Sequence, residues 1–97
     1  MRVYISGPIT GNPTYKRDFK IIEDLLVSQG HEVINPVKIA ECYPYLKYGE
    51  YMKVDLALLE ISDAIYMMDG WEESAGARLE YHYATTVWKD KIKVLHY

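Results

Sequence analysis

The sequence has little cysteine, no excess of positive charge and no long apolar run. Its single cysteine, Cys42, excludes an internal disulfide and lacks the cysteine partner that a structural zinc site would need. Eleven basic residues stand against 14 acidic ones, a net charge of −3, which argues against a nucleic-acid-binding surface. The N-terminal apolar stretch is too short for a signal peptide, and nothing reaches the length of a membrane span. We therefore expect a cytoplasmic protein that binds neither membranes nor nucleic-acid polymers.

Its 97 residues are enough for one domain with one modest core. We treat 1–97 as that domain and expect any active site at the edge of the core. Short β-branched and aromatic runs alternate with stretches of helical periodicity. Strands are predicted at 2–6, 31–35, 63–68 and 91–96, helices at 14–29, 50–62 and 74–89, and an irregular connection with one short helical turn at 36–49.

Strands that alternate with helices predict a parallel sheet with right-handed crossovers. The expected fold is therefore a flavodoxin-like (Rossmann-like) α/β domain, with about four strands and helices on both faces. In such sheets ligands bind at the carboxyl ends of the strands. Those ends carry Ser6-Gly7-Pro8-Ile9-Thr10-Gly11, Asn35-Pro36 and Asp69-Gly70-Trp71.

Two acidic residues fall on helix faces that should be apolar. If Ser74 caps the last helix, Glu80 lies on one stripe with Gly76, Leu79, Tyr83, Ala84 and Val87, because successive residues turn by about 100°. In the preceding helix, Asp55 lies on the stripe of Tyr51, Met52, Leu58 and Leu59. A buried carboxylate without a partner is costly. Each acid is either one member of a structural ion pair or part of a functional site.

Three segments, "YISGPITG", "DLALLEISDAIYMM" and "SAGARLEYHYA", resemble the nucleoside 2-deoxyribosyltransferase superfamily, which includes the 2'-deoxynucleoside 5'-monophosphate N-glycosidases. A short phage and bacterial branch of unassigned function is most similar. The resemblance covers nearly the whole chain and implies that Glu80, between Gly76 and Ala84, is the nucleophile. It implies that Asp55 contacts the base or sugar and that Tyr4 hydrogen-bonds the nucleophile.

The strand ends and the resemblance together predict the substrate-binding residues. They are Gly7, Pro8, Ile9, Thr10, Gly11, Asp69, Gly70, Trp71, Ser74 and Gly76. Ser74 corresponds to a serine that binds phosphate in the monophosphate hydrolases. The first loop of those hydrolases resembles Gly-Ser-Ile-Arg-Gly, whereas Pro8 and Thr10 stand here in place of two phosphate ligands. Trp71 is either a hydrophobic plug or a stacking surface for a base.

We expect no cofactor and no metal, because His31, His82 and His96 share no ligand spacing. The predicted activity is cleavage or exchange of the N-glycosidic bond of a nucleoside or nucleotide. Water as acceptor would make a hydrolase, and a second base a deoxyribosyltransferase. The alternatives are a non-catalytic protein that senses or sequesters a nucleotide-derived ligand, and a purely structural interaction module.

Tyrosines are concentrated at positions 43, 45, 48 and 51. They offer more aromatic surface than one small domain readily buries. The resembling superfamily forms dimers or larger rings in which a neighbour closes the pocket. We therefore expect a homo-oligomer with shared sites, the alternative being that these tyrosines only cover the protein's own sheet edge.

Overall fold

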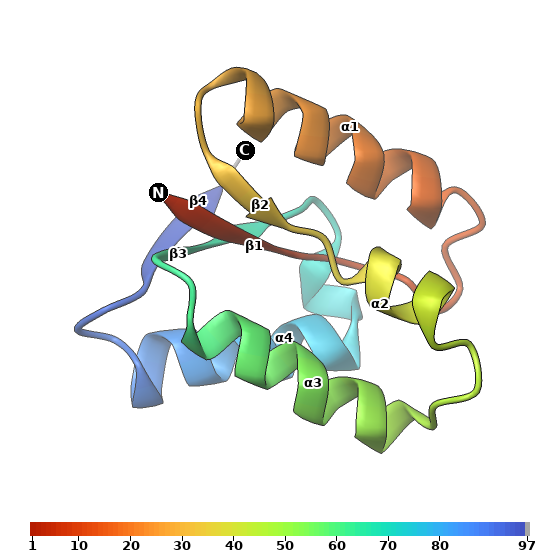
Figure 1. The fold of residues 1–97 in the computed structure, drawn as a ribbon. Helices are drawn as coiled ribbons and strands as arrows, with labels where there is room; N and C mark the ends of the chain where they lie inside the picture. The colour runs from red at the N-terminus through yellow and green to blue at the C-terminus, as the bar shows by residue number, and fades with distance from the viewer. Residues whose placement is uncertain (97) are drawn as a thin grey trace.

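The structure is a computed structural model that describes residues 1–96. Its four strands are β1 (Arg2–Ser6), β2 (Glu32–Ile34), β3 (Ala64–Met67) and β4 (Lys93–His96). All three neighbouring pairs run parallel, in the order β2-β1-β3-β4. The predicted α/β flavodoxin-like fold is confirmed (Figure 1).

The two central strands are buried on both sides. Tyr4 of β1 is paired with Ile34 of β2 and Ile65 of β3. No residue of β3 is more than 5% exposed, as expected for a strand covered by helices on both faces. Because β1 is buried and paired on both sides, it is a rigid support for the groups that its side chains contact.

The helix α1 (Tyr15–Ser28) covers one face of the sheet, and α3 (Tyr48–Glu60) and α4 (Ala75–His82) cover the other (Figure 1). Alternate residues of β1 point to the two faces, as a strand's two-residue period requires. Val3 and Ile5 pack with Phe19 of α1 in one core cluster, and Tyr4 packs with Leu59 of α3 in the other.

The connection predicted to be irregular contains a complete short helix, α2 (Val37–Cys42). The Asn35 side chain accepts a hydrogen bond from the backbone N–H of Val37 at 3.0 Å, which satisfies one of the free donors at the start of α2. After α2 the chain crosses to the opposite face of the sheet and enters α3.

The predicted inward stripe of the last helix is wrong at two positions. Leu79 is 38% exposed and Val87 is 59% exposed. The α-helix ends at His82 and continues as a π-helical segment, η2 (Tyr83–Val87), whose wider turn rotates the later side chains away from the α-helical stripe. The buried positions are instead Ala77, Glu80 and Ala84.

A 3-10 turn, η1 (Trp71–Glu73), links β3 to α4. It begins after Gly70, whose φ of 83° is a left-handed conformation that favours glycine.

Among the described residues no helix is both long and apolar enough to cross a bilayer.

Gly7 lets the loop after β1 pass close to β3. A Cβ at Gly7 would lie 2.8 Å from the Cβ of Met68, too close for any side chain to be tolerated without a shift. We predict that Gly7→Ala lowers the free energy of unfolding by about 1–3 kcal/mol, as overpacking does. Urea denaturation measures this change.

The matched control is Gly49→Ala, at an exposed position in the first turn of α3 with no atom within 4 Å of the added methyl group. It should be neutral or stabilise the protein by up to about 1 kcal/mol, because alanine favours helix. Equal stability of Gly7→Ala and the wild type would show that the loop has room to move.

Candidate active site

Glu80 occupies a fixed place on α4. Ser74 caps this helix by accepting a hydrogen bond from the backbone N–H of Ala77 at 3.2 Å, which satisfies one of the free donors of the first turn. Glu80 follows one and a half turns later and is only 5% exposed. Small residues at Gly76 and Ala77 leave space beside its carboxylate, where both line the same cavity as Glu80.

Two hydroxyl groups of β1 hold the Glu80 carboxylate. The Tyr4 hydroxyl donates a short hydrogen bond to Oε2, and Ser6 Oγ donates to Oε1 at 2.7 Å. Tyr4 and Ser6 have no exposed surface. Because β1 is the central strand and both donors belong to it, the position of the carboxylate is set by the core of the protein.

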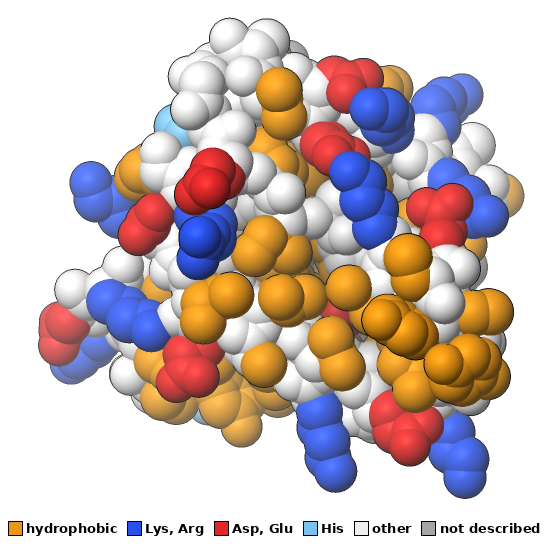
Figure 2. Space-filling model, viewed as in Figure 1, with side chains coloured by type: hydrophobic (Ala, Val, Ile, Leu, Met, Phe, Trp, Pro, Cys, Tyr) orange, Lys and Arg blue, Asp and Glu red, His pale blue; other side chains and the backbone are white. Residues whose placement is uncertain are grey.

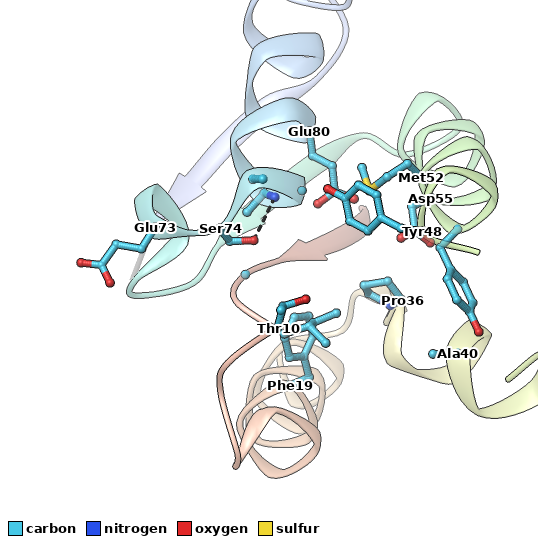
Figure 3. Close-up of a pocket in the computed structure, with 16 residues that line it drawn as sticks. Thr10, Phe19, Pro36, Ala40, Tyr48, Met52, Asp55, Glu73, Ser74 and Glu80 are labelled. Atoms are coloured by element: carbon cyan, nitrogen blue, oxygen red, sulfur yellow. Dashed lines mark hydrogen bonds between the residues drawn. The ribbon is translucent and has the colours of Figure 1, made fainter. Parts of the chain in front are cut away.

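Asp55 faces the same cavity from α3 (Figure 3). Its Oδ1 atom is buried and has no hydrogen-bond partner among the described residues. Native proteins rarely leave a buried polar atom without a partner, and such an atom needs an explanation. A neutral, protonated carboxyl group at Asp55 lowers the cost of this unpaired atom, because a neutral group is cheaper to bury than a carboxylate.

Burial changes the acidity of all three groups. It raises the pKa of Glu80 from 4.5 to about 7, with a smaller increase from the charge of Asp55, while the hydrogen bonds from Tyr4 and Ser6 act in the opposite direction. Burial likewise raises the pKa of Asp55 from 3.8 to about 7. The pKa of Tyr4 is raised well above 10, first by burial and then by the neighbouring acids, so Tyr4 stays a neutral hydrogen-bond donor.

The cavity in front of these groups has a volume of about 700 Å³, within the range of small-molecule sites. It lies at the carboxyl end of β1, between the α1 and α2 side and the α3 and α4 side (Figures 1 and 3). The cavity is lined by Gly7, Ile9, Thr10, Phe19, Pro36, Ala40, Tyr48, Tyr51, Met52, Asp55, Glu73, Ser74, Ala75, Gly76, Ala77 and Glu80.

Most of the predicted site residues meet at this cavity. Glu80, Asp55, Gly7, Ile9, Thr10, Ser74 and Gly76 line it, and Tyr4 reaches it through its bond to Glu80. The cavity walls formed by α3 and α4 come close together at Gly76. A Cβ there would lie 3.4 Å from the Tyr48 hydroxyl and from Met52 Sδ, so Tyr48 extends from α3 across the cavity towards α4 (Figure 3).

The other predicted residues lie outside the lining of this cavity. Pro8 packs towards Gly70, with 3.6 Å between its Cγ and the place of a Cβ on Gly70, and Gly11 turns the loop with a φ of 80°. Trp71 packs on the core beneath α4 and its ring lies 4.5 Å from that of Tyr81, the arrangement of a hydrophobic plug. Asp69 lines a separate cavity of about 330 Å³ with Asp18, Ile21, Ile22, Tyr66 and Met68.

Sequence reasoning missed several lining residues and one donor. Ser6 was placed at the end of a strand but given no role, and its hydroxyl holds Glu80. Phe19, Pro36, Ala40 and Met52 also line the cavity, although the sequence marks them only as members of predicted helices or of the connection 36–49. The available signal was position alone, because Ser6 and Pro36 each stand at the end of a predicted strand.

The described residues contain no group of three or more side chains able to hold a metal ion. Apart from Tyr48 and Tyr51, the described ionisable side chains that line the cavity are carboxyl groups. One acid is oriented by two hydroxyl donors, the other has a free oxygen, and both exchange protons near neutral pH. Such a pair suits nucleophilic and general acid–base catalysis.

A family model described as "Domain of unknown function (DUF4406)" matches residues 1–94. No curated protein matches the chain. The family description names no activity, so membership of the nucleoside 2-deoxyribosyltransferase superfamily stays a prediction.

The raised pKa values of Glu80 and Asp55 predict how stability depends on pH. A group whose folded-state pKa is raised stabilises the fold below its unfolded-state pKa, and that contribution is lost as pH rises through the folded-state value. For Glu80 and Asp55 the loss falls between about pH 4 and pH 7. We predict that Glu80→Gln, which cannot ionise, becomes more stable relative to the wild type by up to about 3 kcal/mol between pH 5 and pH 8.

Urea denaturation at several pH values measures this difference. Glu60→Gln, the same change at an exposed position of α3, is the control and should follow the wild type at every pH. A constant gap between Glu80→Gln and the wild type across this range would mean that Glu80 ionises normally in the folded protein.

Proposed function

Since the chain belongs to the family described as a domain of unknown function (DUF4406), we propose its activity from its site: it is an N-glycosidase or deoxyribosyltransferase that acts on a nucleoside or nucleotide. One observation carries the proposal. Two carboxyl groups from successive helices face one cavity, and one of them is held by two hydroxyl groups of the central strand. The resemblance to the nucleoside 2-deoxyribosyltransferase superfamily supports the same assignment.

In the first step a carboxylate oxygen of Glu80 attacks C1' of the sugar. The bond between C1' and the base nitrogen breaks, its electron pair passes to the base, and the transition state resembles an oxocarbenium ion. Tyr4 and Ser6 keep the carboxylate in position while the new bond forms. The product is a glycosyl-enzyme on Glu80 and a departing base.

Asp55 acts as the general acid that protonates the leaving base. With a pKa of about 7, it carries a proton in a substantial fraction of molecules at neutral pH, so it can protonate the leaving base. The resulting carboxylate can then activate a water molecule or a second base, which attacks C1' and releases Glu80. Glu80 needs the opposite state, a free carboxylate, which the hydrogen bonds from Tyr4 and Ser6 favour.

A non-catalytic binding protein is the competing function. The observation in its favour is that both oxygens of Glu80 already accept hydrogen bonds within the protein. Each oxygen keeps a second lone pair for a sugar carbon, so the two functions differ in turnover and not in the occupancy of the pocket.

We predict that Glu80→Gln lowers the rate of base release by at least about 1,000-fold, because an amide is a poor nucleophile. Asp55→Asn should lower it by about 10²–10⁴-fold, because the amide cannot donate an acidic proton. The assay incubates each protein with ribo- and deoxyribonucleosides and their monophosphates and measures free base by chromatography.

Both variants should still bind the substrate that the wild type cleaves, and Glu60→Gln should cleave it normally. Undiminished turnover by folded Glu80→Gln would refute the mechanism. Binding of a nucleoside by the wild type with no base released, even with a second base present, would instead favour the sequestering function.

The predicted homo-oligomer gains support from the surface around the cavity. Tyr43, Tyr45 and Tyr48 are 48%, 76% and 59% exposed, and hydrophobic side chains gather over α2, α3 and their connection (Figure 2). Tyr48 and Tyr51 line the subunit's own cavity, whereas Tyr45 does not. A second copy bound to this surface would lie against the cavity mouth. The Tyr45 side chain of each copy would then contact the cavity of the other copy.

We predict a dimer or larger assembly at micromolar concentration, measured by light scattering after size-exclusion chromatography; a monomer would refute it. Sharing of sites is tested by mixing Glu80→Gln subunits with Tyr45→Ser subunits, each of low activity alone. Recovery of activity is expected, because a mixed pair contains one cavity with an intact Glu80 and an intact neighbouring Tyr45. No recovery in confirmed mixed oligomers would mean that each subunit has a self-contained site.

A further inference from the structure

The charges around the cavity bear on the substrate. The lining, within the described residues, includes three acidic residues, Asp55, Glu73 and Glu80, and no lysine, arginine or histidine. Asp55 and Glu80 lie inside, whereas the Glu73 carboxylate points away from the cavity at its rim (Figure 3). Protein sites that recognise phosphate usually supply arginine or lysine.

None of the described basic residues on the helices that wall the cavity lines it, and two of them, one on α2 and one on α4, are bonded elsewhere. Lys38 of α2 donates to Glu23 Oε2 at 2.5 Å, and Glu23 is also held by Asn35. Arg78 of α4 donates to the Glu72 carbonyl at 2.8 Å. Neither side chain lines the cavity.

The start of α4 does not replace these missing cations. A helix N-terminus carries about half a positive charge, and Ser74, Ala75 and Gly76 of this one line the cavity. One of its N–H donors is already bonded to Ser74 Oγ. The carboxyl group of Glu80 follows on the same helix and faces the same space.

We propose that the substrate is a nucleoside whose sugar carries no phosphate. The inference rests on the proposed function and narrows it from nucleoside or nucleotide to the unphosphorylated class. The loop after β1 lines the cavity with Ile9 and Thr10 (Figure 3). Thr10 carries a neutral hydroxyl group that suits a sugar hydroxyl.

A phosphate would also interfere with the chemistry. A phosphate monoester carries a charge of about −1.5 to −2 at neutral pH. Placed in this cavity, it would further disfavour ionisation of Glu80, whose burial already does so. The nucleophile would then remain protonated, so the penalty should fall on turnover as well as on binding.

The test compares each nucleoside with its own 5'-monophosphate. Base release by the wild type gives the ratio of kcat/KM values, and titration calorimetry with Glu80→Gln, which should bind without turnover, gives the ratio of Kd values. We expect the monophosphate to be at least about tenfold worse in kcat/KM than the nucleoside, the difference shrinking as salt screens the charges. A monophosphate that is cleaved or bound as well as its nucleoside, for example because a partner subunit supplies a cation, overturns the inference and leaves the N-glycosidase function intact.

Absence of base release and of binding for every nucleoside and monophosphate would refute the proposed function, and the inference with it. A gain-of-charge variant gives a second measurement. Thr10→Lys places an ammonium group at the cavity and should raise the monophosphate-to-nucleoside ratio of kcat/KM by about tenfold, whereas Thr10→Gln, of similar polarity without the charge, should keep the wild-type ratio. An unchanged ratio in active Thr10→Lys would show that phosphate charge does not govern selection.

Discussion

The hydrogen bonds between the central strand and Glu80 are the interaction on which the site depends. Tyr4 and Ser6 belong to the buried part of β1, residues 3–6, and their hydroxyl groups also bond the Glu80 carboxylate. Moving Glu80 would require moving β1, which is paired on both sides. Buried groups therefore hold the Glu80 carboxylate beside the cavity, an arrangement that would preorganise the proposed nucleophile.

The position of the cavity follows from the order of the strands. β1 lies between β2 and β3, so the crossover from β1 leads to one side of it and the crossover from β2 leads back to the other side. The two crossovers run on opposite faces and separate at the carboxyl end of β1. This is the switch point where open α/β sheets bind ligands. The loop after β1 forms one wall, and Gly7 allows that loop to stay close to Met68.

Sequence patterns were sufficient for the fold and for the two acids, because both depend on periodicity. Glu80 and Asp55 stand out as charged residues on apolar stripes, and the structure buries the first and turns the second into the cavity. Helical periodicity gave a wrong prediction where the α-helix becomes the π-helical segment η2, because Val87 lies on the surface there. No residue type in that segment signals the change. Periodicity also could not identify Ser6, because a strand-ending serine looks the same whether it caps a turn or holds a carboxylate. The sequence allows two roles for Trp71, a hydrophobic plug or a stacking surface. Its packing against the ring of Tyr81 favours the plug.

Asp55 and Glu80 have similar pKa values for different reasons, and in the proposed mechanism this difference separates their roles. Glu80 is almost fully buried, and only its two hydroxyl donors prevent a still higher pKa. Asp55 is less buried and has no such donors, so burial alone keeps its proton in place. In the proposed mechanism the Asp55 carboxyl group, which lines the cavity, gives its proton to the base, whereas the Glu80 carboxylate, which accepts a hydrogen bond at each oxygen, attacks along a remaining lone pair. Hydrogen bonding, more than the pKa values themselves, would then separate the proton donor from the nucleophile.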